Sequence, residues 1–231
     1  MLPIAVLAGG FASRLGSLST NTPKCLIEIN GKPFIEWQLE LLKTAGYKDL
    51  VFCLSHKSDQ VKKYLGDGSR YGLNFKYSLD GDKQLGTGGA IKKALPILGQ
   101  NFAVIYGDSY LPIKFTDVEA AFINSSASGL MTVFRNNDQL DTSNVEFFDS
   151  KIIEYNKNIK NLRMNHIDYG LIYFREEAFR PYHNTEVFDL ANLFAYLSTI
   201  KKLDGFEVFN RFFEVGSSQG IKELTSHLKG N

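Results

Sequence analysis

The sequence predicts an α/β fold in which helices flank a mostly parallel sheet. Strand-like apolar runs alternate with helical patterns over the first 108 residues, which is typical of right-handed βαβ units. Several of these runs are apolar throughout, as expected for strands that are buried on both faces. With 231 residues the chain can bury a full core, so we expect one domain covering residues 1–231.

The first strand and the first helix are predicted by their hydrophobic patterns. The run PIAVLAG, residues 3–9, is apolar and ended by glycine, which indicates a buried strand. In PFIEWQLELLKTAG, residues 33–46, one helical face is predicted to hold Phe34, Trp37, Gln38, Leu41, Leu42 and Ala45. Gly46 can cap the end of this helix.

The alternation of strands and helices continues to residue 108. We expect one helix to have Ser58 as its N-cap, and a later one to stop near Pro96. The segments are DLVFCLS (49–55, strand), SDQVKKYL (58–65, helix), LNFKYSL (73–79, strand), GTGGAIKKALPIL (86–98, helix) and FAVIYGD (102–108, strand). Ligands of such sheets bind beyond the carboxyl ends of the strands, so the loops after the strands are the candidate site.

The second half of the chain has a different pattern. Its strand-like segments lie closer together: GLMTVF (129–134), NVEFFDSKIIEYNK (144–157) and DYGLIYF (168–174). Asp149 and Ser150 predict a hairpin turn, and two helices, within residues 189–200 and 218–228, are expected to close the chain. We expect these strands to form a mixed or antiparallel extension of the sheet, folded over the site.

Composition argues for an ordinary globular protein. The net charge is +1, which gives no general attraction to nucleic acid or membrane surfaces. Cys25 and Cys53 each lie in an apolar run, which predicts buried, inert thiols in a reducing cytosol. The apolar run at the N-terminus lacks a basic flank and is too short for a membrane span. These features predict a cytoplasmic protein with no nucleic-acid or membrane partner.

The stretch LAGGFASRLG, residues 7–16, places glycines and an arginine at the end of the first strand. Glycines allow backbone N–H groups to point at phosphate oxygens, Arg14 can bind those oxygens bidentately, and Lys24 can add a point charge. Two glycines alone would indicate only an ordinary turn. The G-x-G-x-x-G and P-loop motifs are absent. Asp108 follows the fourth strand, so it should meet the glycine turn at the same sheet edge.

Together these stretches resemble the signature of the sugar-1-phosphate nucleotidyltransferases. The matching segments are LAGGFASRLG…TPKCLIEINGKPFIEW, QLGTGGAI (84–91) and YGDSY (106–110). The match is tight over about the first 110 residues and traceable to FFEVGSSQGI. Within the family, it looks most like bacterial heptose- or hexose-1-phosphate guanylyltransferases of surface-polysaccharide pathways.

The resemblance implies a Rossmann-like, GT-A-like nucleotidyltransferase fold. Residues 1–111 would be the nucleotide-binding half and residues 112–231 the sugar-phosphate-binding half. Such an enzyme transfers a nucleoside monophosphate from a nucleoside triphosphate to a sugar 1-phosphate and releases pyrophosphate. Guanylyl transfer is favoured, with uridylyl, cytidylyl and thymidylyl transfer left open. A homodimer also remains open.

The resemblance also implies roles for individual residues. The catalytic residues would be Arg14, Lys24 and Asp108. The nucleotide would bind Leu7, Ala8, Gly9, Gly10, Arg14, Lys24, Gln84, Gly86, Thr87 and Gly88. The sugar phosphate would bind Gly89, Asp108, Lys157 and Gly170. The cofactor Mg²⁺ would bind Asp108 and Glu214, although the family usually has an aspartate at the second position.

Structural alternatives exist for five of these residues. Arg14 and Lys24 could be a solvated surface pair, which their context disfavours. Asp108 could be a turn aspartate, Lys157 an exposed charge and Glu214 a surface carboxylate. Two other functions also stay open. A nucleotide-sugar-dependent glycosyltransferase would normally show an Asp-x-Asp motif, which GDSY does not supply. A non-catalytic nucleotide-sugar-binding module would not need Arg14, Lys24 and Asp108 together.

Overall fold

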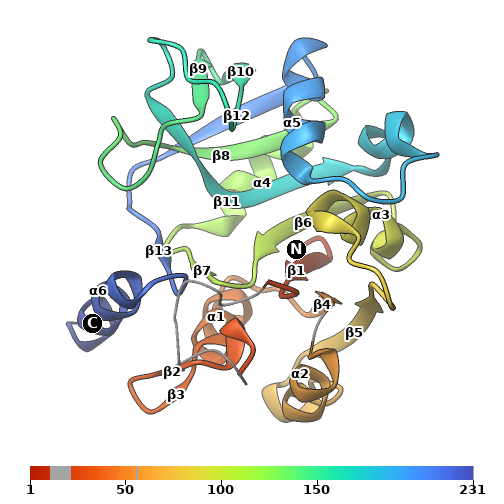
Figure 1. The fold of residues 1–231 in the computed structure, drawn as a ribbon, viewed down its shortest axis with the longest axis vertical. Helices are drawn as coiled ribbons and strands as arrows, with labels where there is room; N and C mark the ends of the chain where they lie inside the picture. Colours follow the sequence, from red (N-terminus) through yellow and green to blue (C-terminus); the bar gives the residue numbers. More distant parts are fainter. Residues whose placement is uncertain (11–21, 56, 231) are drawn as a thin grey trace.

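The computed structural model describes residues 1–10, 22–55 and 57–230, and a nine-stranded mixed sheet forms the centre of this part (Figure 1). Its strands are β1 (Ile4–Leu7), β4 (Asp49–Leu54), β5 (Asn74–Leu79), β6 (Asn101–Tyr106), β8 (Gly129–Arg135), β9 (Val145–Phe148), β10 (Lys151–Tyr155), β11 (His166–Arg175) and β12 (Leu203–Val208). Two short pairs lie beside it: β2 (Glu28–Ile29) with β3 (Lys32–Pro33), and β7 (Ser109–Tyr110) with β13 (Phe213–Glu214).

The strand order is β5-β4-β1-β6-β11-β8-β12-β10-β9. The first four strands of this order are parallel to one another. β11 is antiparallel to β6 and to β8, and β12 is parallel to β8. The β9–β10 hairpin is antiparallel and turns at Asp149 and Ser150, both at positive φ. The predicted α/β fold, with a parallel first half and a mixed extension, is confirmed.

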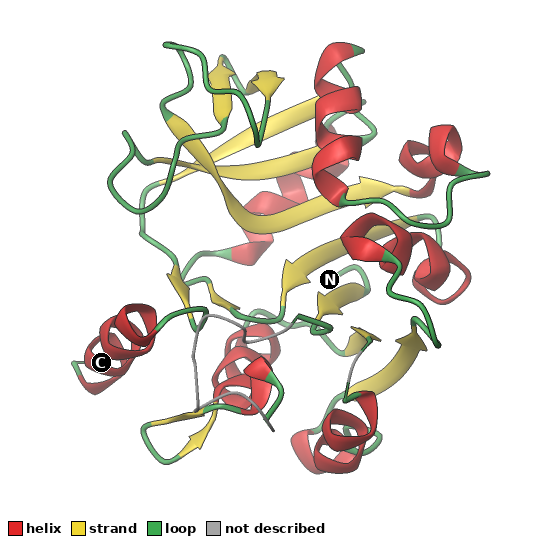
Figure 2. Ribbon diagram, viewed as in Figure 1, coloured by secondary structure: helices red, strands yellow, loops and turns green. Residues whose placement is uncertain are grey.

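Helices cover both faces of the sheet (Figure 2). α1 (Phe34–Thr44), α2 (Ser58–Leu65) and α4 (Phe115–Asn124) pack on one face, and α3 (Gly86–Leu98) and α5 (Leu190–Thr199) pack on the other. The chain also forms the 3₁₀ helices η2 (Lys24–Leu26), η3 (Ser69–Tyr71) and η4 (Glu176–Tyr182). Along β1, Ile4 and Val6 point into the first core and Ala5 into the second, as the period of two requires.

A third, smaller core holds α6 (Ser218–Lys229) against the rest of the molecule. It includes Ile29 of β2, Phe34 of α1, Phe213 of β13 and Leu224 of α6. Because β13 is fixed by this core and pairs with β7, residues near the C-terminus are carried to the end of the parallel sheet (Figure 1).

The helix predicted to stop near Pro96 continues through it to Leu98. Proline removes a single N–H from the backbone ladder, and only two residues of the helix follow it. The helix ends where Gly99, at a φ of 81°, donates its N–H to the carbonyl oxygen of Leu95. The expected N-cap of α2 also shifts by one position, because Lys57 takes this place at positive φ and Ser58 begins the helix.

Both cysteines are buried, and burial raises the pKa of each thiol to about 12. The prediction of buried thiols is therefore confirmed. Over the described ranges, no helix combines the length and the apolar character needed to cross a bilayer.

Candidate active site

A cavity of about 310 Å³ opens where the four parallel strands end. Each strand contributes the residues that follow it, as expected for an α/β sheet. The lining residues are Leu7, Ala8, Gly9, Gly10, Lys24, Cys25, Cys53, Leu54, Ser55, Asp80, Gln84, Gly86, Thr87, Ala90, Tyr106, Gly107, Asp108 and Asp189. The sequence-based candidates thus meet in one cavity, except Gly88, Gly89, Lys157, Gly170 and Glu214, which lie outside its lining, and Arg14, which lies outside the described residues.

The glycine turn after β1 lies close to the neighbouring strand β4. The Ser55 hydroxyl donates to the carbonyl oxygen of Gly9 at 2.7 Å. A Cβ atom on Gly9 would lie 2.7 Å from the Ser55 Oγ, so this position accepts no larger residue without movement. Gly10 is exposed, and among the described residues no atom lies within 4 Å of where its Cβ would be. The turn therefore offers a bare backbone surface to a ligand in the cavity.

Lys24 and Asp108 form an ion pair in this cavity, with 3.1 Å between Nζ and Oδ2. Both side chains are partly exposed, at 20 % and 31 %. Gln38 of α1 lies beneath the turn that carries Asp108, and its Nε2 donates to the carbonyl oxygens of Tyr106 and Ser109, each at 2.8 Å. Gln38 is only 1 % exposed, so a buried amide holds this turn in place.

Glu214 lies beside Asp108 because β13 pairs with β7. Glu214 is opposite Ser109, and the N–H of Val215 donates to the carbonyl oxygen of Asp108 at 2.9 Å. The protein atoms around its carboxyl group, and next the charge of Asp108, raise the pKa of Glu214 to about 7, while Lys24 acts in the opposite direction. Two carboxylates and one ammonium group therefore share this end of the site.

The segment QLGTGG contributes to the cavity in part. Gln84, Gly86 and Thr87 line it, whereas Gly88 and Gly89 are buried. The N–H groups of these two glycines donate to the carbonyl oxygen of Phe188, at 2.9 and 3.1 Å. A Cβ on Gly88 would lie 2.3 Å from the Phe188 ring, and a Cβ on Gly89 would lie 2.3 Å from the carbonyl oxygen of Glu186. These glycines serve close packing here, and the prediction that they bind ligand gains no support from this geometry.

Lys157 and Gly170 lie near a carboxylate that the sequence analysis did not single out. The Asp168 carboxylate accepts from the N–H of Gly170 at 3.0 Å and lies 3.4 Å from the hydroxyl of Tyr106, a cavity residue. Burial raises the pKa of Asp168 to about 6, and the charge of Lys157 opposes this shift. Gly170 has a φ of 104°, which favours glycine. The DYG motif was the available sequence signal for Asp168.

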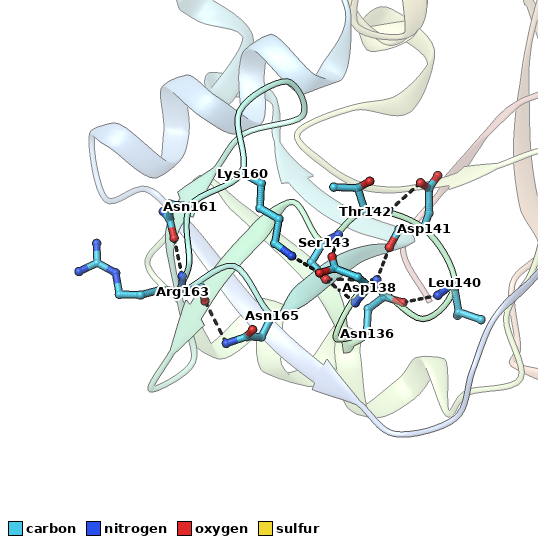
Figure 3. A network of polar contacts seen from close by, with 10 residues as sticks. All are labelled: Asn136, Asp138, Leu140, Asp141, Thr142, Ser143, Lys160, Asn161, Arg163 and Asn165. Carbon is cyan, nitrogen blue, oxygen red and sulfur yellow. Dashed lines mark hydrogen bonds and ion pairs between the residues drawn. The ribbon is translucent and has the colours of Figure 1, made fainter.

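Two loops, 136–143 and 160–165, are tied together on the side of the extension, where the ion pair between Lys160 and Asp138 joins them (Figure 3). The charge of Asp141, in the first loop, also raises the pKa of Glu214. The first loop therefore contributes to the electrostatics around Glu214.

These features define an α/β protein with a ligand cavity at the carboxyl edge of its parallel strands. Residues 4–144 match the family described as nucleotidyl transferase, and the chain belongs to this family. The chain is 32% identical over 184 residues to D-glycero-alpha-D-manno-heptose 1-phosphate guanylyltransferase of Campylobacter jejuni, covering 79% of this chain and 80% of the relative. It is 42% identical over 123 residues to N-acetylmuramate alpha-1-phosphate uridylyltransferase of Neisseria meningitidis serogroup B, covering 53% of this chain but only about half, 52%, of the relative.

Solved structures share the fold over the whole chain. HddC from Yersinia pseudotuberculosis complexed with GMP-PN has a TM-score of 0.82 at 21% identity, covering 99% of this chain and 100% of that one. The inositol-1-phosphate CTP transferase from T. maritima has the same TM-score and identity, covering 99% and 96%. The predicted resemblance to sugar-1-phosphate nucleotidyltransferases is confirmed, since the two relatives are named for that chemistry.

Proposed function

We propose that this protein transfers a nucleoside monophosphate from a nucleoside triphosphate to a sugar 1-phosphate and releases pyrophosphate. The observation that carries the proposal is the Lys24–Asp108 pair, which lies beside the bare glycine turn at the carboxyl edge of a parallel sheet. Its geometry offers an ammonium group for phosphate oxygens and a carboxylate for a metal ion.

The residues at this edge fit the cofactor Mg²⁺. Asp108 and Glu214 supply oxygen ligands, which this hard cation prefers. The charge of Asp108 contributes to the raised pKa of Glu214, and a shared cation relieves that repulsion. Mg²⁺ is typically held by one or two carboxylates together with substrate phosphates, so two protein carboxylates suffice. When bound, the ion supplies positive charge to the reacting phosphates.

The protein's task is to bring two polyanions into line. The second pKa of a phosphate monoester is near 6, so the sugar phosphate is already largely ionised at pH 7 and needs no general base. Lys24 binds triphosphate oxygens and reduces the repulsion of the incoming phosphate. Lys157 binds the sugar phosphate, and Gly170 contacts the sugar ring. Arg14 adds a second cation for the triphosphate.

We also propose a division of labour along the chain. Residues 1–111 bind the nucleotide, residues 112–231 bind the sugar phosphate, and the preferred transfer is guanylyl, as in the name of the C. jejuni relative. The product is a nucleotide sugar for surface-polysaccharide synthesis.

The test measures pyrophosphate released from GTP, UTP, CTP and dTTP, each with a panel of hexose and heptose 1-phosphates and Mg²⁺. We expect release only when a triphosphate and a sugar 1-phosphate are both present. Pyrophosphate release from no pair, together with transfer of sugar from a nucleotide sugar to an acceptor, would instead identify a glycosyltransferase.

A further inference from the structure

A carboxylate lies at the end of the cavity away from the Lys24–Asp108 pair. Asp80 directly follows β5 and lines the cavity together with Gln84. The strand order β5-β4-β1-β6 separates the end of β5 from the end of β6, where Asp108 lies, by three strand spacings, or roughly 14 Å. A nucleoside triphosphate is elongated, so phosphates bound at Lys24 place its base toward the Asp80 end.

The Asp80 carboxylate has capacity to bind a ligand. Its Oδ2 accepts the backbone N–H of Leu85 at 3.2 Å, and this fixes the side chain. The ammonium group of Lys93 donates to the main-chain oxygen of Asp80, at 3.2 Å, and not to the carboxylate. An ionised carboxylate can accept about four hydrogen bonds, so a single bond from the described residues leaves acceptor capacity on a cavity wall.

We propose that Asp80 selects the base, and that it selects guanine. This inference rests on the proposed function and specifies its nucleotide. Guanine presents two adjacent donors, N1–H and the 2-amino group, which match the two acceptors of a carboxylate. Uracil and thymine present one N–H between two carbonyl oxygens, and these oxygens face a carboxylate unfavourably. Adenine and cytosine present an amino group beside a ring acceptor, so each loses one of the two bonds.

The relatives are named for both uridylyl and guanylyl transfer, so base choice has to come from residues of this chain. A site built to receive hydrogen bonds discriminates strongly against an analogue that lacks a donor, since a buried acceptor is then left without a partner. Asp80 is half-buried on the cavity wall, and its carboxylate is already oriented by the N–H of Leu85.

The test compares the wild type with Asp80→Asn by calorimetric binding of GTP, ITP, XTP and UTP, without a sugar phosphate. ITP lacks the 2-amino group of guanine, and XTP has a carbonyl oxygen in its place. We expect the wild type to bind GTP at least ~10-fold more tightly than ITP. In Asp80→Asn the amide oxygen can keep the bond to the N–H of Leu85. The new NH₂ group is a donor, so it would face the 2-amino donor of guanine unfavourably but could bond to the carbonyl oxygen that xanthine has in its place. GTP binding should fall ~10–100-fold, and XTP should bind more tightly than GTP.

Asp82→Asn is the matched control, because Asp82 is exposed in the same loop and lies outside the cavity lining. Its GTP:ITP ratio should equal that of the wild type. An unchanged GTP:ITP ratio in Asp80→Asn, or tighter binding of UTP than of GTP by the wild type, would overturn the inference. Because binding is measured without a sugar phosphate, either result leaves the proposed transfer reaction standing. GTP selection without pyrophosphate release would reject the reaction and keep the role of Asp80.

Discussion

The ammonium nitrogen of Lys24 lies 3.1 Å from Oδ2 of Asp108, although 84 positions separate the two residues in the sequence. Partly exposed pairs of this kind contribute little to stability, about 0–1 kcal/mol. The pair lies in the cavity beside the glycine turn, where an apolar core gains nothing from either charge. Substitutions of these two residues should therefore change activity much more than stability.

Lys24→Ala should lower kcat about 10²–10³-fold while the thermal midpoint changes little, because one preorganised charge on the triphosphate is lost. Steady-state pyrophosphate release and thermal unfolding of the same preparation check this. Lys48→Ala is the control, since Lys48 is exposed and outside the cavity lining. Near-wild-type turnover of a folded Lys24→Ala protein would remove Lys24 from the reaction.

Asp108→Asn should abolish Mg²⁺-dependent turnover with only a modest change in thermal stability. The amide is nearly isosteric with the carboxylate but is a poor ligand for a hard cation. A magnesium titration of turnover provides the measurement. Asp59→Asn, an exposed change on α2, should leave the titration unaltered. If Asp108→Asn keeps its rate and its magnesium dependence, this carboxylate does not bind the metal.

Much of the fold could be predicted because the buried parallel strands have continuous apolar sequences. Among the larger elements, α4 and β12 were not predicted, and neither were the two-residue strands β2, β3, β7 and β13 or the 3₁₀ helices. The helix α4 does carry a helical pattern, with buried Phe115, Val118 and Phe122. The strand β12 has no such signal, since Gly205 interrupts it. Position 205 has to be glycine because a Cβ there would lie 2.6 Å from the ring of Phe147. Phe147 lies far from Gly205 in the sequence, so the local pattern gives no sign of this contact.

The strand-end rule predicted only part of the site, because Lys24 was singled out by its charge near the glycine turn and Gln84 and Thr87 by the family resemblance. That rule located Asp108, and the same rule applies to Asp80, which follows the next-to-last parallel strand in chain order. The position of Glu214 depends on the two-residue pairing of β13 with β7, and such a short non-local contact has no periodicity. Gly88 and Gly89 were expected to contact the nucleotide and the sugar phosphate, and this stays a prediction, because glycine for close packing looks in the sequence like glycine for ligand binding.

Gln38 should act as a positioning residue for Asp108. Gln38→Met removes the Nε2 donor and leaves the carbonyl oxygens of Tyr106 and Ser109 without this partner, at a cost of roughly 1–3 kcal/mol in stability. Below the unfolding transition, we also expect a higher magnesium concentration for half-maximal rate and a lower kcat.

The control is Tyr47→Phe, which removes the buried hydrogen bond between the hydroxyls of Tyr47 and Tyr173. This variant should lose stability and keep the magnesium titration of the wild type. If Gln38→Met behaves in the same way, Gln38 is a core residue with no influence on the metal site.

Asp168 should give stability a specific pH dependence. Burial raises its pKa to about 6 in the folded protein, whereas the ordinary value is 3.8. Between these two pH values the folded state keeps a proton on Asp168 that the unfolded state has lost. The contribution of this proton to the free energy of unfolding is therefore fully present below pH 4 and is lost as the pH rises through 6. Asp168→Asn lacks this loss. Its stability relative to the wild type should increase by roughly 1–3 kcal/mol between pH 4 and pH 7. Denaturant unfolding at both pH values measures this, and a constant difference would contradict the raised pKa.

Glu214 provides the last prediction, because its carboxyl group can bind either a proton or the metal. With a pKa of about 7 in the metal-free protein, Glu214 is increasingly protonated as the pH falls from 8 to 6. The magnesium concentration for half-maximal rate should therefore rise over that interval in the wild type. Glu214→Gln should need more magnesium at pH 8 and show a flatter pH dependence. Glu214→Asp should be mild, since it keeps a carboxylate. Identical magnesium titrations of the wild type and Glu214→Gln at pH 8 would leave Asp108 as the metal carboxylate and make Glu214 a surface group.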